Sequence, residues 1–97
     1  MPQVAVGTTP VNVVPRSAGR KTVTIRNVST GGETIFFWLQ DSRGLATTNA
    51  DYALLVNEEK TFMEYFDGQD VKNPIAAVAS GANGIVLYGE TNEYVGQ

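Results

Sequence analysis

Residues 21–28, KTVTIRNV, carry the clearest structural pattern in this chain. Val23 and Ile25 fall on one face of an extended segment, whereas Thr22 and Thr24 fall on the opposite face. This period of two is typical of a strand with one buried face and one solvated face. The Ser, Thr and Gly residues that follow favour a turn, so the stretch predicts one complete β-strand.

The same pattern continues along the chain in both directions. Short runs rich in Val, Ile and Phe alternate with Gly, Pro, Asn and Asp about every ten residues, and no stretch has a helical period. We therefore expect an all-β fold, an antiparallel β-sandwich that is jelly-roll-like, with about eight short strands. The expected strands lie at residues 3–6, 11–14, 21–28, 34–40, 52–56, 60–66, 75–80 and 85–88. Asn83-Gly84 favours a type I′ hairpin turn between the last two of them.

The chain of 97 residues has the size of one domain. A domain of this length removes roughly 65% of its unfolded-chain surface from water, which is enough for one modest core. We expect a single β-sandwich domain at residues 11–90 and a polar C-terminal tail at residues 91–97. Pro10 and Pro15 flank the strand at residues 11–14, and proline cannot donate to a ladder, so this strand belongs at a sheet edge.

Residues 1–10 leave two alternatives open. Val4 and Val6 alternate as in a strand, yet the segment also contains two prolines and a Gly-Thr-Thr turn signal. The segment is either an N-terminal arm that becomes ordered on a partner, or an edge strand of its own sandwich.

The composition excludes several classes of function. The net charge is −3 and the seven basic residues are scattered, which provides no electrostatic footprint for nucleic acid. The chain has no Cys and no His, the residues that supply thiolate nucleophiles and many general bases and metal ligands. We therefore expect no enzyme, no catalytic residue, no cofactor and no metal site. Because a signal-peptide pattern and a long apolar run are also missing, we expect a soluble protein made in the cytoplasm, without membrane contact.

Two acidic clusters offer alternatives to that expectation: Glu58-Glu59 and Asp67 to Asp70, with Glu64 between them. Glycosidase chemistry needs only two carboxyl groups that face each other, roughly 5–9 Å apart, across a groove. A surface Ca²⁺ site is the second alternative, although the ligand spacing of an EF-hand loop is missing. We interpret both clusters as turn residues on a solvated edge.

The run at residues 34–40, TIFFWLQ, is apolar on both faces. One face can enter the core, which leaves Phe36 and Trp38 in need of a second partner. A domain of this size has difficulty burying both faces of a strand, and closed homo-oligomers are a common solution. We therefore expect self-association, with a homotrimer as the specific prediction. The candidate residues of an oligomer or partner interface are Val4, Val6, Phe36, Trp38 and Tyr65.

Four aromatic side chains with a polar atom suggest a further binding mode. A row of Trp38, Tyr52, Tyr65 and Tyr88 on one sheet face would form a platform on which carbohydrate could stack. The alternative is that these side chains pack in the core or in a subunit interface, where aromatic residues are enriched. We favour the alternative.

The order of these segments resembles a family. The sequences VPR at 14–16, GRKTVTIRN at 19–27, LLVNEE at 54–59 and AAVASG at 76–81 follow one another as in small β-sandwich virion proteins of tailed bacteriophages. These are the capsid decoration or cement proteins and the related head-fibre and tail modules. The resemblance covers about residues 11–90 and rests on a rhythm of strands and turns, without a catalytic signature.

The resemblance implies a function. Such a protein would be a trimer with a jelly-roll-like fold, seated on the outer capsid surface at three-fold positions, where it clamps neighbouring subunits of the major capsid protein. It would have no cofactor, and it would reside on the virion after synthesis in the host cytoplasm. The alternative within the same resemblance is a tail or head-fibre module that binds carbohydrate. No binding motif of the family is sharp enough to assign to individual residues here.

Overall fold

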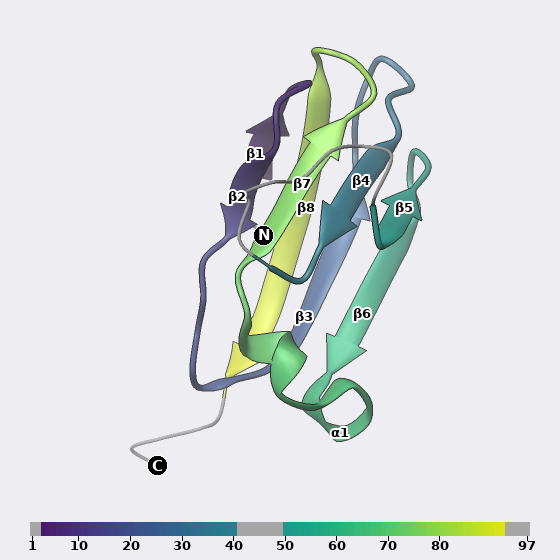
Figure 1. Ribbon diagram of the computed structural model, residues 1–97. Coiled ribbons are helices and arrows are strands. Elements are labelled where there is room, and N and C mark those ends of the chain that lie inside the picture. The colour runs from purple at the N-terminus through teal and green to yellow at the C-terminus, as the bar shows by residue number, and fades with distance from the viewer. Residues whose placement is uncertain (1–2, 41–49, 93–97) are drawn as a thin grey trace.

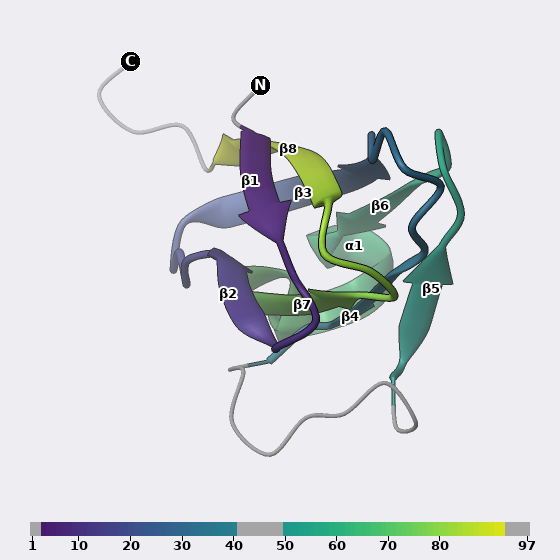
Figure 2. The same cartoon turned by 90° about the horizontal axis from the view of Figure 1, so that it is seen from above.

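The computed structural model of the chain describes residues 3–40 and 50–92, which form two four-stranded antiparallel sheets packed face to face (Figure 1, Figure 2). The expected all-β sandwich is confirmed. The strands are β1 (Gln3–Val6), β2 (Val11–Val14), β3 (Arg20–Asn27), β4 (Ile35–Trp38), β5 (Tyr52–Leu54), β6 (Glu59–Met63), β7 (Ile75–Ala79) and β8 (Gly84–Asn92). A helical turn α1 (Glu64–Asp67) and a 3₁₀ helix η2 (Gly68–Lys72) lie between β6 and β7.

The strand pairing is nested. Sheet A has the order β1-β8-β3-β6 and sheet B has the order β2-β7-β4-β5. Each early strand therefore pairs with a late one, β1 with β8, β2 with β7, β3 with β6 and β4 with β5. Successive strands change sheet at every connection except the one from β4 to β5, so most of the turns cross between the layers.

This topology corrects the hairpin predicted at Asn83-Gly84. The strands on either side of it, β7 and β8, lie in different sheets, and Gly84 does not have a positive φ. A Cβ atom on Gly84 would lie 2.5 Å from Ala79 Cβ and 2.6 Å from the Val6 carbonyl oxygen. Glycine is therefore required because the sheets approach closely here, and not because of the turn type.

The core lies between the sheets. The alternation predicted for residues 21–28 is confirmed, because Val23 and Ile25 are fully buried while Thr22 and Thr24 lie on the outer face of sheet A. Phe37, Tyr52 and Phe62 join the two layers: the rings of Phe37 and Tyr52 stack at 5.0 Å, and Phe62 meets Tyr52 edge to face at 5.1 Å.

Both N-terminal strands are edge strands. Residues 3–6 pair with β8, and Val6 is buried in the core, so this segment is the first strand of its own sandwich. The alternative of an arm that waits for a partner is not what the fold shows. β2 lies at the edge of sheet B, as the two prolines predicted.

Two element boundaries differ from the predictions by more than two residues. The strand predicted at residues 60–66 ends at Met63, and the chain then turns through α1 and η2. β8 continues to Asn92, so the first two residues of the predicted tail at 91–97 belong to the sheet. Most of the long loop predicted between Asp41 and Asp51 lies outside the described residues, as does the rest of the tail.

The two ends of the sandwich are built differently (Figure 1). We call the end with α1, η2 and the segment 15–20 the helical end. The opposite end, with the turns at 28–34, 55–58 and 80–83, is the turn end. In the described part of the chain, no helix has the length and apolar character needed to cross a membrane.

Candidate functional site

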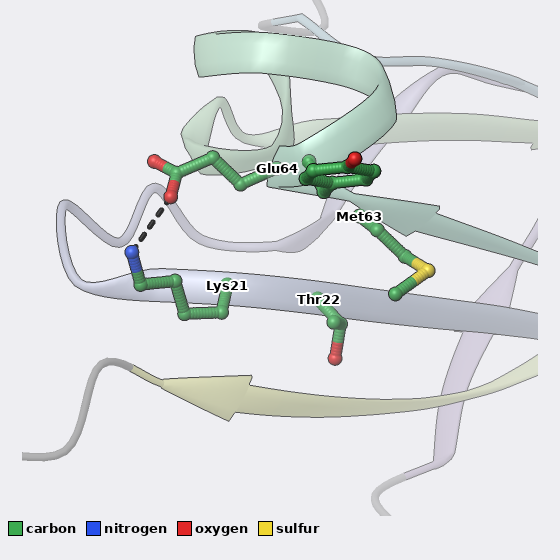
Figure 3. Close-up of a pocket in the computed structure, with 5 residues that line it drawn as sticks. Lys21, Thr22, Met63 and Glu64 are labelled. Carbon is green, nitrogen blue, oxygen red and sulfur yellow. Dashed lines mark hydrogen bonds and ion pairs between the residues drawn. The ribbon is translucent and has the colours of Figure 1, made fainter.

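A shallow hollow opens at the helical end, where β3 begins and β6 passes into α1. It has a volume of about 400 Å³ and is lined by Lys21, Thr22, Met63, Glu64 and Tyr65. In Figure 3 the Lys21 side chain bends toward the Glu64 carboxylate, and Met63 extends from the end of its strand. The hollow is therefore formed by the inner strand β3, the edge strand β6 and the helical turn α1.

Two exposed side chains dominate the rim of this hollow. Tyr65 is 87% exposed and Met63 is 39% exposed. Tyr65 is the one exposed aromatic residue among those whose side chains the structure describes. Tyrosine and methionine are enriched at protein interfaces, where a rigid or adaptable apolar group fills a pocket of the partner.

The backbone around Tyr65 is fixed by local hydrogen bonds. The N–H of Met63, the last residue of β6, donates to Oδ2 of Asp67 at 2.8 Å. Gly68 then has a φ of +68°, a conformation that glycine adopts without strain, and this redirects the chain into η2. The buried side chain of Val71 attaches η2 to the core.

Charge pairs hold the first residue of α1. Oε1 of Glu64 accepts a hydrogen bond from Lys21 Nζ at 2.7 Å, and Oε2 pairs with Lys72 Nζ at 2.8 Å. The hydrogen bonds from Lys21 and Lys72 lower the pKa of Glu64 from 4.5 to about 2, against a smaller opposing effect of desolvation. The carboxylate is therefore ionised at neutral pH, with both oxygens engaged, and cannot serve there as a proton donor.

A buried arginine attaches this end to the rest of the sandwich. The Arg20 guanidinium has no exposed surface, and its Nε donates to the Glu90 carboxylate at 2.6 Å. Its Nη1 donates to the carbonyls of Val71 and Asn73, each at 3.0 Å, and its Nη2 donates to the carbonyl of Pro15. One side chain thus joins β3, β8, η2 and the connection before β3.

The acidic clusters behave as turn and edge residues where the structure describes their contacts. Oε1 of Glu58 accepts the N–H of Leu55 at 2.7 Å within the turn, and Glu59 lies 3.7 Å from Arg26. Glu64 faces two lysines and not a second carboxyl group. Within residues 3–40 and 50–92, no group of three or more acidic residues is arranged to hold a metal ion.

The five predicted interface residues do not form one surface. Val4 is half-buried against the core, and Val6 is buried within it. Trp38 is only 2% exposed and lies in a second apolar cluster on the outer face of sheet B, with Phe36 half-buried beside it. Trp38 is thus buried within the protomer, which corrects the expectation that it needs a partner. Of the five, Tyr65 alone is exposed.

The row of aromatic residues that a carbohydrate platform would need is not formed, which agrees with the favoured interpretation that these side chains pack elsewhere. Tyr52 stacks on Phe37, and Tyr88 packs against the core. With Trp38 buried as well, Tyr65 has none of the other three beside it on an exposed sheet face. The described residues therefore do not build the stacking platform that a carbohydrate would need.

No local sequence signal indicates that Arg20 is buried. Simple alternation places it on the same outer face as Thr22, but the register against β8 steps from Arg20↔Asn92 to Thr22↔Thr91. Two residues of β3 thus oppose one of β8, and such a bulge turns a side chain to the other face. Nothing in the local sequence marks this bulge, because it depends on a strand some 70 residues away.

Comparisons of the chain with protein-family models, with curated proteins and with solved structures found no match.

Proposed function

We propose that this protein is a bacteriophage capsid decoration, or cement, protein that binds the outer surface of the head and stabilises it. Its partner would be the major capsid protein, and its location the surface of the virion. The observation that carries this proposal is the exposed Tyr65, which follows Met63 on a helical turn whose backbone is anchored by Asp67. A segment whose backbone is already ordered loses less conformational entropy on binding, which suits a protein that acts by contact alone.

The fold supports the same proposal at a coarser level. The nested pairing of four early strands with four late ones agrees with a jelly roll, in which one long antiparallel hairpin wraps into two sheets. Jelly rolls recur in viral capsid proteins. We therefore propose a jelly roll as the finer description of the sandwich.

A homotrimer remains part of the proposal, but for a different reason. Trp38 is already buried within one protomer, so the two apolar faces of β4 no longer require self-association. The trimer now rests on the resemblance to decoration proteins and on avidity, because three weak capsid contacts joined in one particle bind far more tightly than one. Light scattering should give three times the 10.4 kDa of a single chain; the mass of a monomer at micromolar concentration would overturn this part.

Co-sedimentation with empty phage heads tests the binding site. We expect the wild-type protein to pellet with the heads, and Tyr65→Ala to weaken this binding at least tenfold, which corresponds to about 1.4 kcal/mol. Leu55→Ala is the matched control, because Leu55 is also exposed, at 59%, but lies at the turn end. Equal binding by both variants would remove Tyr65 from the interface.

The same assay separates the alternative function. A tail module would leave the heads in the pellet without this protein, and it would bind purified tails or host cells instead. If the protein binds tails and Tyr65→Ala abolishes that binding, Tyr65 stays the binding site and the partner is a tail protein. Binding to neither heads nor tails would overturn the proposal.

A further inference from the structure

The outer edge of β6 carries a second surface with a distinct chemistry. β6 lies at the end of sheet A and pairs with β3 alone among the described strands. An edge strand presents backbone N–H and C=O groups that can pair with another chain, and proteins usually protect such edges. The protection at β6 can be traced to one side chain.

The direction of the backbone groups on β6 follows from the ladder. The Asn27 N–H donates to the Glu58 carbonyl at 3.0 Å and the Asn27 carbonyl accepts the Asn57 N–H at 2.7 Å, so both backbone groups of Asn27 point toward β6, as in a hydrogen-bonded pair of the antiparallel ladder. Such pairs alternate along two strands, so Lys60 and Phe62 direct their backbone groups toward β3. The residues between and beside them, Glu59, Thr61 and Met63, direct theirs outward.

The Met63 N–H confirms this direction and shows how the edge is closed. It donates outward to Asp67 Oδ2 at 2.8 Å, and α1 returns this carboxylate to the strand end. Asp67 therefore occupies the last outward donor of the edge. Its negative charge also stands beside that donor.

A second copy of the chain is the partner that this edge fits best. If two β6 strands paired antiparallel about Thr61, Thr61 would oppose Thr61, Lys60 would oppose Phe62, and Glu59 would oppose Met63. No like charges face each other directly in this register, and Lys60 already lies 5.6 Å from the ring centroid of its own Phe62. The pairing would need the Met63 N–H to donate to the Glu59 carbonyl of the second copy.

We propose that Asp67 prevents the β6 edge from pairing with a second copy of this chain. Its carboxylate accepts the Met63 N–H that such a ladder requires. In a symmetric pair of strands this donor would be missing at both ends. Asp67 also places a negative charge where Glu59 of the second copy would arrive. The capsid-binding proposal concerns the Tyr65 side chain, and this one concerns the backbone edge of β6, but both involve the hydrogen bond between Met63 and Asp67.

Asp67→Ala tests the inference, with Asp70→Ala as the matched control. Both residues are exposed and both substitutions remove one negative charge, but Asp67 alone has its carboxylate on the edge donor in the described contacts. Sedimentation velocity over a range of concentrations should show self-association of Asp67→Ala at least tenfold tighter than that of Asp70→Ala and wild type. Equal behaviour of the two variants would overturn the proposal.

Thr61→Pro separates edge pairing from simple loss of structure. Proline at this position removes an outward N–H and leaves the backbone bonds to β3 intact, although it also removes the side-chain hydrogen bond between Thr61 Oγ1 and Thr24 Oγ1. We expect the double variant Asp67→Ala/Thr61→Pro to return to the wild-type sedimentation profile. If the double variant still associates like Asp67→Ala, the contact is not made through this edge, and the proposal is wrong.

Discussion

The helical end and the turn end of the sandwich are held together by different forces. At the helical end, Arg20 and Glu64 make charged hydrogen bonds to Glu90, Lys21 and Lys72. At the turn end the central side chain is neutral, although the carboxylates of Glu33 and Glu58 also accept backbone N–H groups there. Asn27 is fully buried, and its amide donates to the carbonyls of Glu33 and Leu54 at 2.8 and 2.9 Å.

This difference has a consequence for what each end can display. Asn27 also accepts the Ser29 N–H at 3.0 Å, so its amide joins three segments through short backbone contacts. Arg20 reaches further and attaches a helical segment that contributes one buried side chain, Val71, in the described residues. The long Arg20 side chain can thus hold the helical segment next to Tyr65, which lies outside the sheets. The shorter Asn27 amide instead joins strands and turns of the sandwich directly.

The largest expected effect is at Arg20. Arg20→Met leaves the carbonyls of Val71 and Asn73 and the Glu90 carboxylate without their buried donor, which should cost about 3–5 kcal/mol in the free energy of unfolding. Urea denaturation measures this. Arg26→Met is the control, because Arg26 is 44% exposed and only 3.7 Å from its partner, and it should cost less than about 0.5 kcal/mol. Similar losses in both variants would contradict a special role of the helical end.

Gly84→Ala tests the turn end by steric means. The new methyl group would meet Ala79 Cβ and the Val6 carbonyl well inside contact distance, so we expect a loss of about 2–3 kcal/mol in the free energy of unfolding. Gly7→Ala is the control, since no atom lies within 4 Å of a Cβ there, and it should change stability by no more than about 1 kcal/mol. Because packing causes the loss at Gly84, it should be the same in low and high salt. A loss that salt reduces would contradict a packing cause at Gly84.

The sequence predicted those features that depend on local pattern. The period of two at residues 21–28 and the two prolines around β2 were enough to assign the strands and one sheet edge. Gly84 shows where this reasoning fails. Its neighbour Asn83 suggested a turn type, but the reason for glycine is the approach of Ala79 and Val6 from other strands.

The candidate site was only partly predictable for the same reason. Tyr65 was named as a contact residue within an expected strand, although it lies on α1. The strand pattern continues past Met63 in the sequence, and the helical turn forms where Asp67 returns to the strand end and Gly68 adopts a positive φ. The segment that follows, η2, is held by the bond from Arg20 Nη1 to the Val71 carbonyl, a contact between distant residues that no local pattern contains.

Glu64 makes the helical end sensitive to pH. Its pKa falls from 4.5 to about 2 in the folded protein, so its stabilising effect is present above about pH 4.5 and is lost as the pH falls through about 2. Urea denaturation should show Glu64→Gln less stable than wild type at neutral pH, with the difference narrowing across this range. High salt should narrow it at neutral pH as well, because partly exposed ion pairs are screened. If the difference in stability between Glu64→Gln and wild type does not change with pH or with salt, the Glu64 side chain acts by packing.

The smallest expected effect on stability is at Tyr65, and it bears most directly on function. Since the side chain is 87% exposed, Tyr65→Ala should change the free energy of unfolding by no more than about 0.5 kcal/mol. Tyr52→Ala is the contrast, because that ring stacks on Phe37 in the core, and it should cost about 2 kcal/mol or more by urea denaturation. An exposed aromatic residue that adds nothing to folding but reduces attachment to phage heads when removed would be a docking residue. If Tyr65→Ala instead destabilises the protein by more than about 1 kcal/mol, the ring supports the helical end itself, and its exposure no longer argues for a partner.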